Sequence, residues 1–242
     1  MSWPVLAALA AAVLVGAVTM RATGMGFALV AAPFLVLALG PFEGILVANV
    51  CGTASALLNL TQVHSDIDWR RARWVIPAGV VGVVPGAVAV RVLPSAVLSI
   101  VIGAIVLLGL AFTVASRNIT APNSPLVAGA GGLASGFMNV TAGVGGPGLV
   151  VYALATDWPH ARFAATAQVH FAVLGVASLA MKLALPSLGW LGWLVLAAAL
   201  GLGLAGGNLL ARRIDASAAM RLVIAIAGLG AVLALVQGVR GL

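Results

Sequence analysis

Charged residues are scarce in this sequence of 242 amino acids. Asp, Glu, Lys and Arg make up 7% of the chain, and only five residues are acidic, whereas soluble domains carry about 25% charged residues. Hydrophobic residues make up 63%, so the chain has too little polar surface to cover itself in water. This composition excludes a soluble enzyme, a secreted disulfide scaffold and a disordered tail, and it predicts an integral membrane protein.

Cysteine occurs once, at Cys51. A single cysteine excludes an internal disulfide and offers no pair of thiolate ligands for a metal. Thiol chemistry needs a basic neighbour that favours the thiolate, and no residue adjacent in the sequence supplies one. Cys51 is therefore interpreted as a small buried hydrophobic residue, and neither a metal site nor a cofactor is predicted.

Long apolar runs, separated by glycine, proline and polar residues, predict membrane helices and not the alternating strands of a barrel. The first run is interpreted as a retained helix, because no basic stretch precedes it and no small-residue cleavage site follows. The sequence predicts an all-α, polytopic bundle that forms one transmembrane domain. Its ten segments lie at about 3–20, 27–40, 43–63, 74–91, 95–115, 125–140, 146–157, 160–183, 187–210 and 217–238.

Two of these segments, 27–40 and 146–157, are too short to cross a membrane. At 1.5 Å per residue they reach about 20 Å, less than the hydrocarbon core. Each follows a glycine cluster, and short, glycine-interrupted segments at corresponding positions are typical of broken helices at a transporter's binding site. Broken or re-entrant helices are therefore predicted near 21–27 and 141–147.

The two halves of the sequence match at an offset of 119 residues. We interpret residues 1–120 as a first membrane repeat and 121–242 as a second. Five segments in each half is an odd number, so the halves are expected to be inverted, with a substrate site near the midplane. The coinciding pairs include Gly24 with Gly143, Gly26 with Gly145, Asn49 with Gln168, Cys51 with His170, and Trp74 with Trp193.

The net charge of +7 comes from 12 basic residues that stand singly or in short clusters between apolar runs. This distribution is typical of topology determinants and not of nucleic-acid binding. If all ten segments cross, Arg91, Lys182 and Arg240 lie on one side and the other basic residues on the opposite side. The more basic side is predicted to be cytoplasmic, with both termini outside the cytoplasm.

The candidate substrate-binding residues come from the two glycine clusters and the polar segments after them. A helix that begins at Gly26 or Gly146 would present free N–H groups and the positive end of its dipole, which suit an anion. Arg21 and Arg162 are predicted charge contacts, with snorkelling at the membrane surface as the alternative. The predicted set is Thr23, Gly24, Met25, Gly26, Asn49, Thr53, Asn139, Thr141, Gly143, Gly145, Gly146, Gln168 and His170.

Packing is the alternative for many of these features. Glycines four residues apart let membrane helices approach closely, which is our interpretation of Gly82 with Gly86 and of Gly203 with Gly207. Polar side chains in a membrane also join helices by hydrogen bonds. For His170, substrate binding or proton relay and a plain interhelical hydrogen bond both stay open.

On these residues the chain resembles the TauE/SafE family of sulfite exporters and toluene-sulfonate-uptake permeases. The resemblance covers essentially the whole chain and departs from the pattern at Phe27, where many members have glycine. It implies a bacterial-type inner-membrane carrier with two inverted halves and no prosthetic group, for sulfite or organosulfonates such as sulfoacetate. The residues that carry it are Gly24-Met25-Gly26, Pro33, the polar segment 43–59, Gly143-Val144-Gly145-Gly146-Pro147, Arg162, Gln168 and His170.

The leading hypothesis is a secondary transporter that exports a small sulfur-containing anion by alternating access. The alternatives are an anion channel that uses the same loops and a permease for another small organic anion. An intramembrane enzyme is disfavoured, because the sequence has no nucleophile motif or metal-binding cluster. The expected partners are the anionic substrate and the lipid bilayer; a homodimer is compatible with the glycine-lined helix faces, and no nucleic acid is expected.

Overall fold

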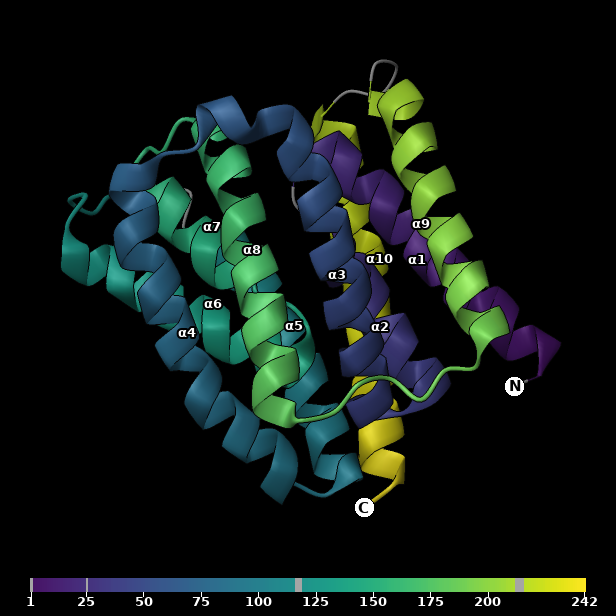
Figure 1. Cartoon of the computed structure of the whole chain (residues 1–242). Coiled ribbons are helices and arrows are strands. Elements are labelled where there is room, and N and C mark those ends of the chain that lie inside the picture. Colours follow the sequence, from purple (N-terminus) through teal and green to yellow (C-terminus); the bar gives the residue numbers. More distant parts are fainter. Residues whose placement is uncertain (1, 25, 116–118, 212–215) are drawn as a thin grey trace.

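The computed structural model describes residues 2–24, 26–115, 119–211 and 216–242 (Figure 1). Within these ranges the chain is helical, without strands, which confirms the prediction of an all-α bundle of about ten segments. The helices are α1 (Trp3–Thr23), α2 (Phe27–Leu39), α3 (Pro41–Val63), the short 3-10 helix η1 (His64–Asp66), α4 (Trp69–Val92), α5 (Ser95–Ala115), α6 (Pro125–Ala142), α7 (Gly146–Ala155), α8 (His160–Lys182), α9 (Trp190–Ala211) and α10 (Ala216–Arg240).

Seven of the described helices are long and apolar enough to cross a membrane, namely α1, α3, α4, α5, α8, α9 and α10. Helices α2 and α7 have only 13 and 10 residues. At 1.5 Å per residue they are about 20 Å and about 15 Å long, so neither crosses the hydrocarbon core alone. The chain is a multi-pass membrane protein that contains two short helices at the predicted places.

Proline and capping residues set where several helices begin. Pro41, Pro125 and Pro147 lie in the first turns of α3, α6 and α7, where a missing N–H costs nothing. The side chain of Asp68 accepts a hydrogen bond at the start of α4, and that of Ser124 does so at the start of α6. These caps satisfy N–H groups that a helix start leaves without partners.

The helices pack in pairs that join distant parts of the chain. Helix α1 packs mainly against α9, α6 against α4, α5 against α10, and α3 against α8. Figure 1 shows α3 and α8 in the middle of the molecule. Both chain termini lie at one end of the bundle, and the α3–α4 connection lies at the other.

Glycines allow two of these helix pairs to approach closely. On α4, a Cβ atom at Gly82 would lie 2.2 Å from a backbone oxygen of α6, and one at Gly86 would lie 2.3 Å from a side chain of α6. On α9, a Cβ atom at Gly203 would lie 2.6 Å from a backbone oxygen of α1, and one at Gly207 would lie 2.7 Å from the Cβ of Arg21. The packing interpretation of these four glycines is confirmed.

Candidate functional site

The two glycine clusters break their helices in the same way. Helix α1 ends at Gly24 with φ of 77°, and α6 ends at Gly143 with φ of 71°. The N–H of Gly24 donates to the Met20 carbonyl at 2.9 Å, and that of Gly143 donates to the Asn139 carbonyl at 2.8 Å. Only glycine adopts this left-handed conformation without steric cost. Glycine at positions 24 and 143 therefore allows both helices to end there without backbone strain.

The short helices after these breaks begin without side-chain caps. Their N-cap residues are Gly26 for α2 and Gly145 for α7, and neither has a side chain that could accept a hydrogen bond from the first N–H groups of the helix. The first N–H groups of a helix lack partners within the helix, and the helix dipole gives this end a partial positive charge. Both helix starts can therefore donate hydrogen bonds to an anion.

A small cavity lies between the two breaks. Its volume is about 40 Å³, whereas a single water needs about 10–15 Å³ on this measure, so it has room for a small ion. No charged side chain is among its described wall residues. These are Met20, Gly26, Phe27, Ala28, Leu29, Ala48, Asn49, Gly52, Thr53, Asn139, Gly143, Gly145, Gly146, Phe171 and Gly175.

Asn49 lies in the cavity wall, and its side-chain amide makes no hydrogen bond with the described residues. It lies in the middle of α3 and is only 2% exposed, yet neither its Oδ1 nor its Nδ2 has a hydrogen-bond partner among the described residues. The hydroxyl of Thr53, one turn further along α3, is likewise buried without a partner. An unsatisfied buried polar group costs about 1–3 kcal/mol, so a hydrogen-bonding ligand in the cavity would be stabilised here.

Gln168, which coincides with Asn49 at the sequence offset of 119, has a different environment. Its Nε2 donates to the carbonyl oxygens of Gly24 at 2.9 Å and Ala164 at 3.0 Å, and it is not among the cavity wall residues. Its Oε1 is buried and has no partner among the described residues. Gln168 thus ties α8 to the break after α1 and does not face the cavity.

His170 likewise is not among the cavity wall residues. Its ring is fully buried, and its Nε2 lies 2.9 Å from the Ser135 hydroxyl. That hydroxyl donates to the Gly145 carbonyl at 2.7 Å, so Ser135 can accept only from a protonated Nε2. His170 makes the interhelical hydrogen bond that was one of its two interpretations, and it reaches the loop before α7 indirectly.

The remaining predicted polar residues of the second half bond within the protein. The Thr141 hydroxyl donates to the Phe137 carbonyl in its own helix at 2.6 Å and is not in the cavity wall. Asn139 is in the wall, and its Oδ1 accepts from the Ser178 hydroxyl of α8 at 2.9 Å. Cys51 is a free, buried cysteine, as predicted.

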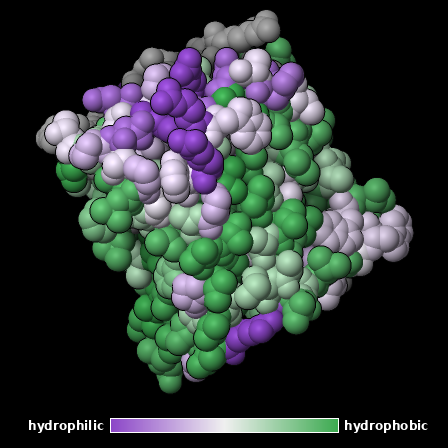
Figure 2. Space-filling view, turned by 60° about the vertical axis from the view of Figure 1, so that its left-hand side comes forward, coloured by the Kyte–Doolittle hydropathy of each residue, from purple (hydrophilic) through white to green (hydrophobic). Residues whose placement is uncertain are grey.

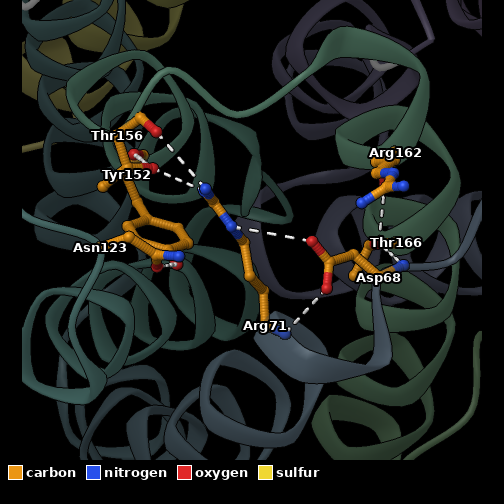
Figure 3. A network of polar contacts seen from close by, with 7 residues as sticks. All are labelled: Asp68, Arg71, Asn123, Tyr152, Thr156, Arg162 and Thr166. Atoms are coloured by element: carbon orange, nitrogen blue, oxygen red, sulfur yellow. Dashed lines mark hydrogen bonds and ion pairs between the residues drawn. The ribbon is translucent and has the colours of Figure 1, made fainter.

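The two predicted arginines lie away from the cavity. Arg21 donates to the side-chain oxygen of Gln62 at 2.8 Å, near the end of α3. Arg162 lies in a polar surface cavity beside Asp68 (Figure 3). Glu43, which coincides with Arg162 at the sequence offset of 119, accepts hydrogen bonds from the backbone N–H and hydroxyl of Ser187.

Met25 and the side chain of Thr23 lie outside the described residues. Gly24 is not in the cavity wall, but a Cβ atom there would lie 3.1 Å from the Cβ of Ala164 on α8. The predicted residues that share the cavity are Gly26, Asn49, Thr53, Asn139, Gly143, Gly145 and Gly146.

Sequence reasoning missed the two aromatic rings of the cavity, Phe27 and Phe171. At the offset of 119, Phe27 coincides with Gly146, and Phe171 coincides with Gly52. Each of these four residues is in the wall, and a Cβ atom at Gly52 would lie 3.6 Å from the Phe27 ring. The exchange of phenylalanine and glycine at matched positions was a usable indication of both rings.

The comparisons with known proteins give one match. The family model described as "Sulfite exporter TauE/SafE" matches residues 8–235. The comparison with curated proteins and the comparison with solved structures found no match. The family match covers nearly the whole chain and implies membrane export of sulfite or a related anion. With its helical membrane architecture, the chain belongs to the TauE/SafE sulfite exporter family, which is a family of membrane transporters and not of enzymes.

Proposed function

We propose that the protein is a secondary transporter that exports a small sulfur oxyanion, with sulfite as the best-fitting substrate and organosulfonates such as sulfoacetate as larger candidates. The observation that carries the proposal is the cavity between Gly26 and Gly145. Two uncapped helix starts meet there with the unpartnered amide of Asn49. Its small volume favours a compact anion over a long one.

The wall chemistry suits an anion that has to be released again. Backbone N–H groups and an amide bind an oxyanion by hydrogen bonds without a fixed positive charge. A buried arginine would form stronger, charge-assisted hydrogen bonds with the same anion. A site without charged walls supports turnover, because it stabilises the anion only moderately.

The site residues are proposed to belong to two inverted repeats, residues 1–120 and 121–242. Helix α3 spans residues 41–63 and α8 spans 160–182, and both of their ends differ by 119. The helix pairing is reciprocal as well, because α1 packs on α9 while their counterparts α6 and α4 pack together. Both observations support a pseudo-two-fold relation, with alternating access by rocking of one half against the other.

The test is uptake of radiolabelled sulfite into proteoliposomes that contain the purified protein. We expect saturable uptake, and we expect Asn49→Ala to reduce it at least tenfold. The matched control is Asn59→Ala, on the same helix, because the Asn59 amide donates to the Ser55 carbonyl of its own helix and does not line the cavity. Equal uptake by the wild type and Asn49→Ala would refute the site, and no saturable uptake of any sulfur anion would refute the function.

A counterflow measurement separates a carrier from an anion channel. Proteoliposomes loaded with unlabelled sulfite should take up external labelled sulfite faster than empty ones, because a carrier exchanges its substrate. A channel shows no such stimulation. Sulfoacetate and a non-sulfur organic anion, added as competitors, then define the substrate class.

The membrane and the orientation are part of the same proposal. We place the chain in a bacterial-type inner membrane with the α3–α4 connection and the start of α4, which carries Arg70, Arg71 and Arg73, in the cytoplasm. The positive-inside rule supports this orientation. For export, the inside-negative potential then favours outward movement of an anion by about 2.3 kcal/mol per charge per 100 mV.

A further inference from the structure

A second, larger cavity lies at the end of the bundle that carries the α3–α4 connection. Its volume is about 400 Å³, and it opens between the starts of α4, α6 and α8. Four arginines line it, namely Arg70, Arg71, Arg73 and Arg162, together with the single acidic residue Asp68. The cavity therefore has a strong positive charge, and it is separate from the proposed substrate site.

Arg71 and Asp68 are used within the protein (Figure 3). The Nε of Arg71 lies 3.7 Å from an Asp68 carboxylate oxygen, and its Nη1 donates to the Thr156 hydroxyl at 2.7 Å. The guanidinium also stacks over the Trp158 ring, 4.8 Å from its centroid. Asp68 thus offsets the charge of Arg71, and among the described residues it forms no ion pair with Arg70, Arg73 or Arg162.

The other three arginines are free to bind an anion. Arg70, Arg73 and Arg162 are exposed, and none of their guanidinium groups donates a hydrogen bond or forms an ion pair among the described residues. Arg73 only lies over the ring of Trp74. Guanidinium groups bind phosphate in a two-pronged geometry, so this cluster suits a phosphate group.

The surroundings indicate the depth of a lipid headgroup. Trp69 is 63% exposed and Trp74 is 45% exposed, and exposed tryptophans concentrate at the membrane–water interface. Figure 2 shows hydrophilic residues gathered at one end of the molecule above largely hydrophobic flanks. The arginine cavity belongs to that polar end, directly above the apolar surface that faces lipid.

An apolar groove adjoins the cavity. The groove has a volume of about 470 Å³, lies between α5, α6 and α7, and shares one wall residue, Tyr152, with the arginine cavity. Because Tyr152 lines both, the apolar groove lies next to the arginine cluster. A molecule with an anionic head and a hydrocarbon tail matches both features, whereas free phosphate matches only the first.

We propose that this cavity binds the phosphate of an acidic phospholipid, with one acyl chain in the adjoining groove. Basic pockets between membrane helices bind such headgroups through electrostatic attraction and hydrogen bonds. The binding is independent of anion transport. Its failure would therefore leave the proposed function untouched.

The experiment measures binding of phosphatidylglycerol and phosphatidylcholine to the purified chain by native mass spectrometry. We expect the wild type to bind phosphatidylglycerol at least tenfold more tightly than phosphatidylcholine. Arg70→Gln/Arg162→Gln should lose most of this preference, and it should keep its fold because neither guanidinium has a hydrogen-bond or ion-pair partner among the described residues. Arg91→Gln/Arg240→Gln removes the same charge from the other end of the bundle and should keep the preference.

Three results would overturn the proposal. One is equal binding of the two lipids by the wild type. The second is an unchanged preference in Arg70→Gln/Arg162→Gln. The third is displacement of phosphatidylglycerol by millimolar inorganic phosphate, which would identify a site for a free anion.

Discussion

Gln168 of α8 donates a hydrogen bond to the carbonyl oxygen of Gly24, 144 residues earlier in the chain. This bond joins the second half of the protein to the helix break of the first. In the proposed repeat, the counterpart of Gln168 is Asn49, whose side chain is one methylene shorter and makes no hydrogen bond with the described residues. The longer side chain of Gln168 stabilises the helix break at Gly24, whereas the shorter side chain of Asn49 lies in the cavity wall without a hydrogen-bond partner among the described residues.

The length of the Gln168 side chain is therefore a testable property. Gln168→Asn keeps the amide but withdraws it by about 1.5 Å, so the bond to Gly24 should be lost. We expect both Gln168→Asn and Gln168→Ala to destabilise the protein by about 1 kcal/mol and to raise the KM for sulfite several-fold. Thermal unfolding and uptake kinetics measure the two effects. Wild-type behaviour of Gln168→Asn would contradict the assigned contact.

The contact of His170 with Ser135 predicts a specific pattern of rescue. A glutamine at position 170 can present an N–H near the place of Nε2, whereas asparagine is too short. His170→Gln should keep most of the uptake, while His170→Asn and Ser135→Ala should lose at least tenfold. Ser135→Ala removes the donor to the Gly145 carbonyl, and His170→Asn removes the ring nitrogen that orients the Ser135 hydroxyl toward that carbonyl. The uptake assay at saturating and at low sulfite checks this order. Equal loss in Gln and Asn variants would point to direct chemistry by the imidazole.

The left-handed conformation of Gly143 predicts sensitivity to a single methyl group. Gly143→Ala should cost about 1–2 kcal/mol, the usual penalty for a side chain in this region, and the added Cβ would lie 3.2 Å from that of Ala48. Gly129→Ala, in the same helix α6 with no atom within 4 Å of the new Cβ, should be neutral or stabilising. Thermal unfolding of the two variants and of the wild type measures these changes in stability. A stable Gly143→Ala protein would contradict the assigned backbone conformation.

The sequence predicted the helices well because glycine and proline mark their ends. The segment predicted at 146–157 forms α7 from Gly146 to Ala155. The segment predicted from 74 instead begins at Trp69, because Asp68 caps the helix and the arginines continue it beyond the apolar run. The segment predicted from 187 begins only at Trp190, after Ser187 is held by the distant carboxylate of Glu43.

The candidate site was predictable only as far as backbone and periodicity determine it. The glycine clusters and Asn49 stand out by residue type and by the offset of 119, and they share a cavity. Residue type and periodicity do not determine how far a side chain reaches. Gln168 and His170 were predicted together with Asn49, yet both lie outside the cavity wall: Gln168 bonds to the break at Gly24, and His170 bonds to Ser135, which in turn bonds to Gly145. Phe27 and Phe171 resemble ordinary apolar residues of membrane helices, and the exchange of phenylalanine and glycine at the offset of 119 is the one sequence indication that they belong to the same site.

The arrangement of the chain ends predicts which positions a membrane-impermeant thiol reagent can reach. Both termini lie at one end of the bundle and η1 lies at the other (Figure 1), and the native Cys51 is buried. In a Cys51→Ala background, Leu242→Cys should react in intact bacterial cells, whereas the exposed Ser65→Cys should react only after the cells are opened. The reverse pattern would overturn the proposed orientation. Reaction of both positions in intact cells would contradict their placement on opposite sides of the membrane.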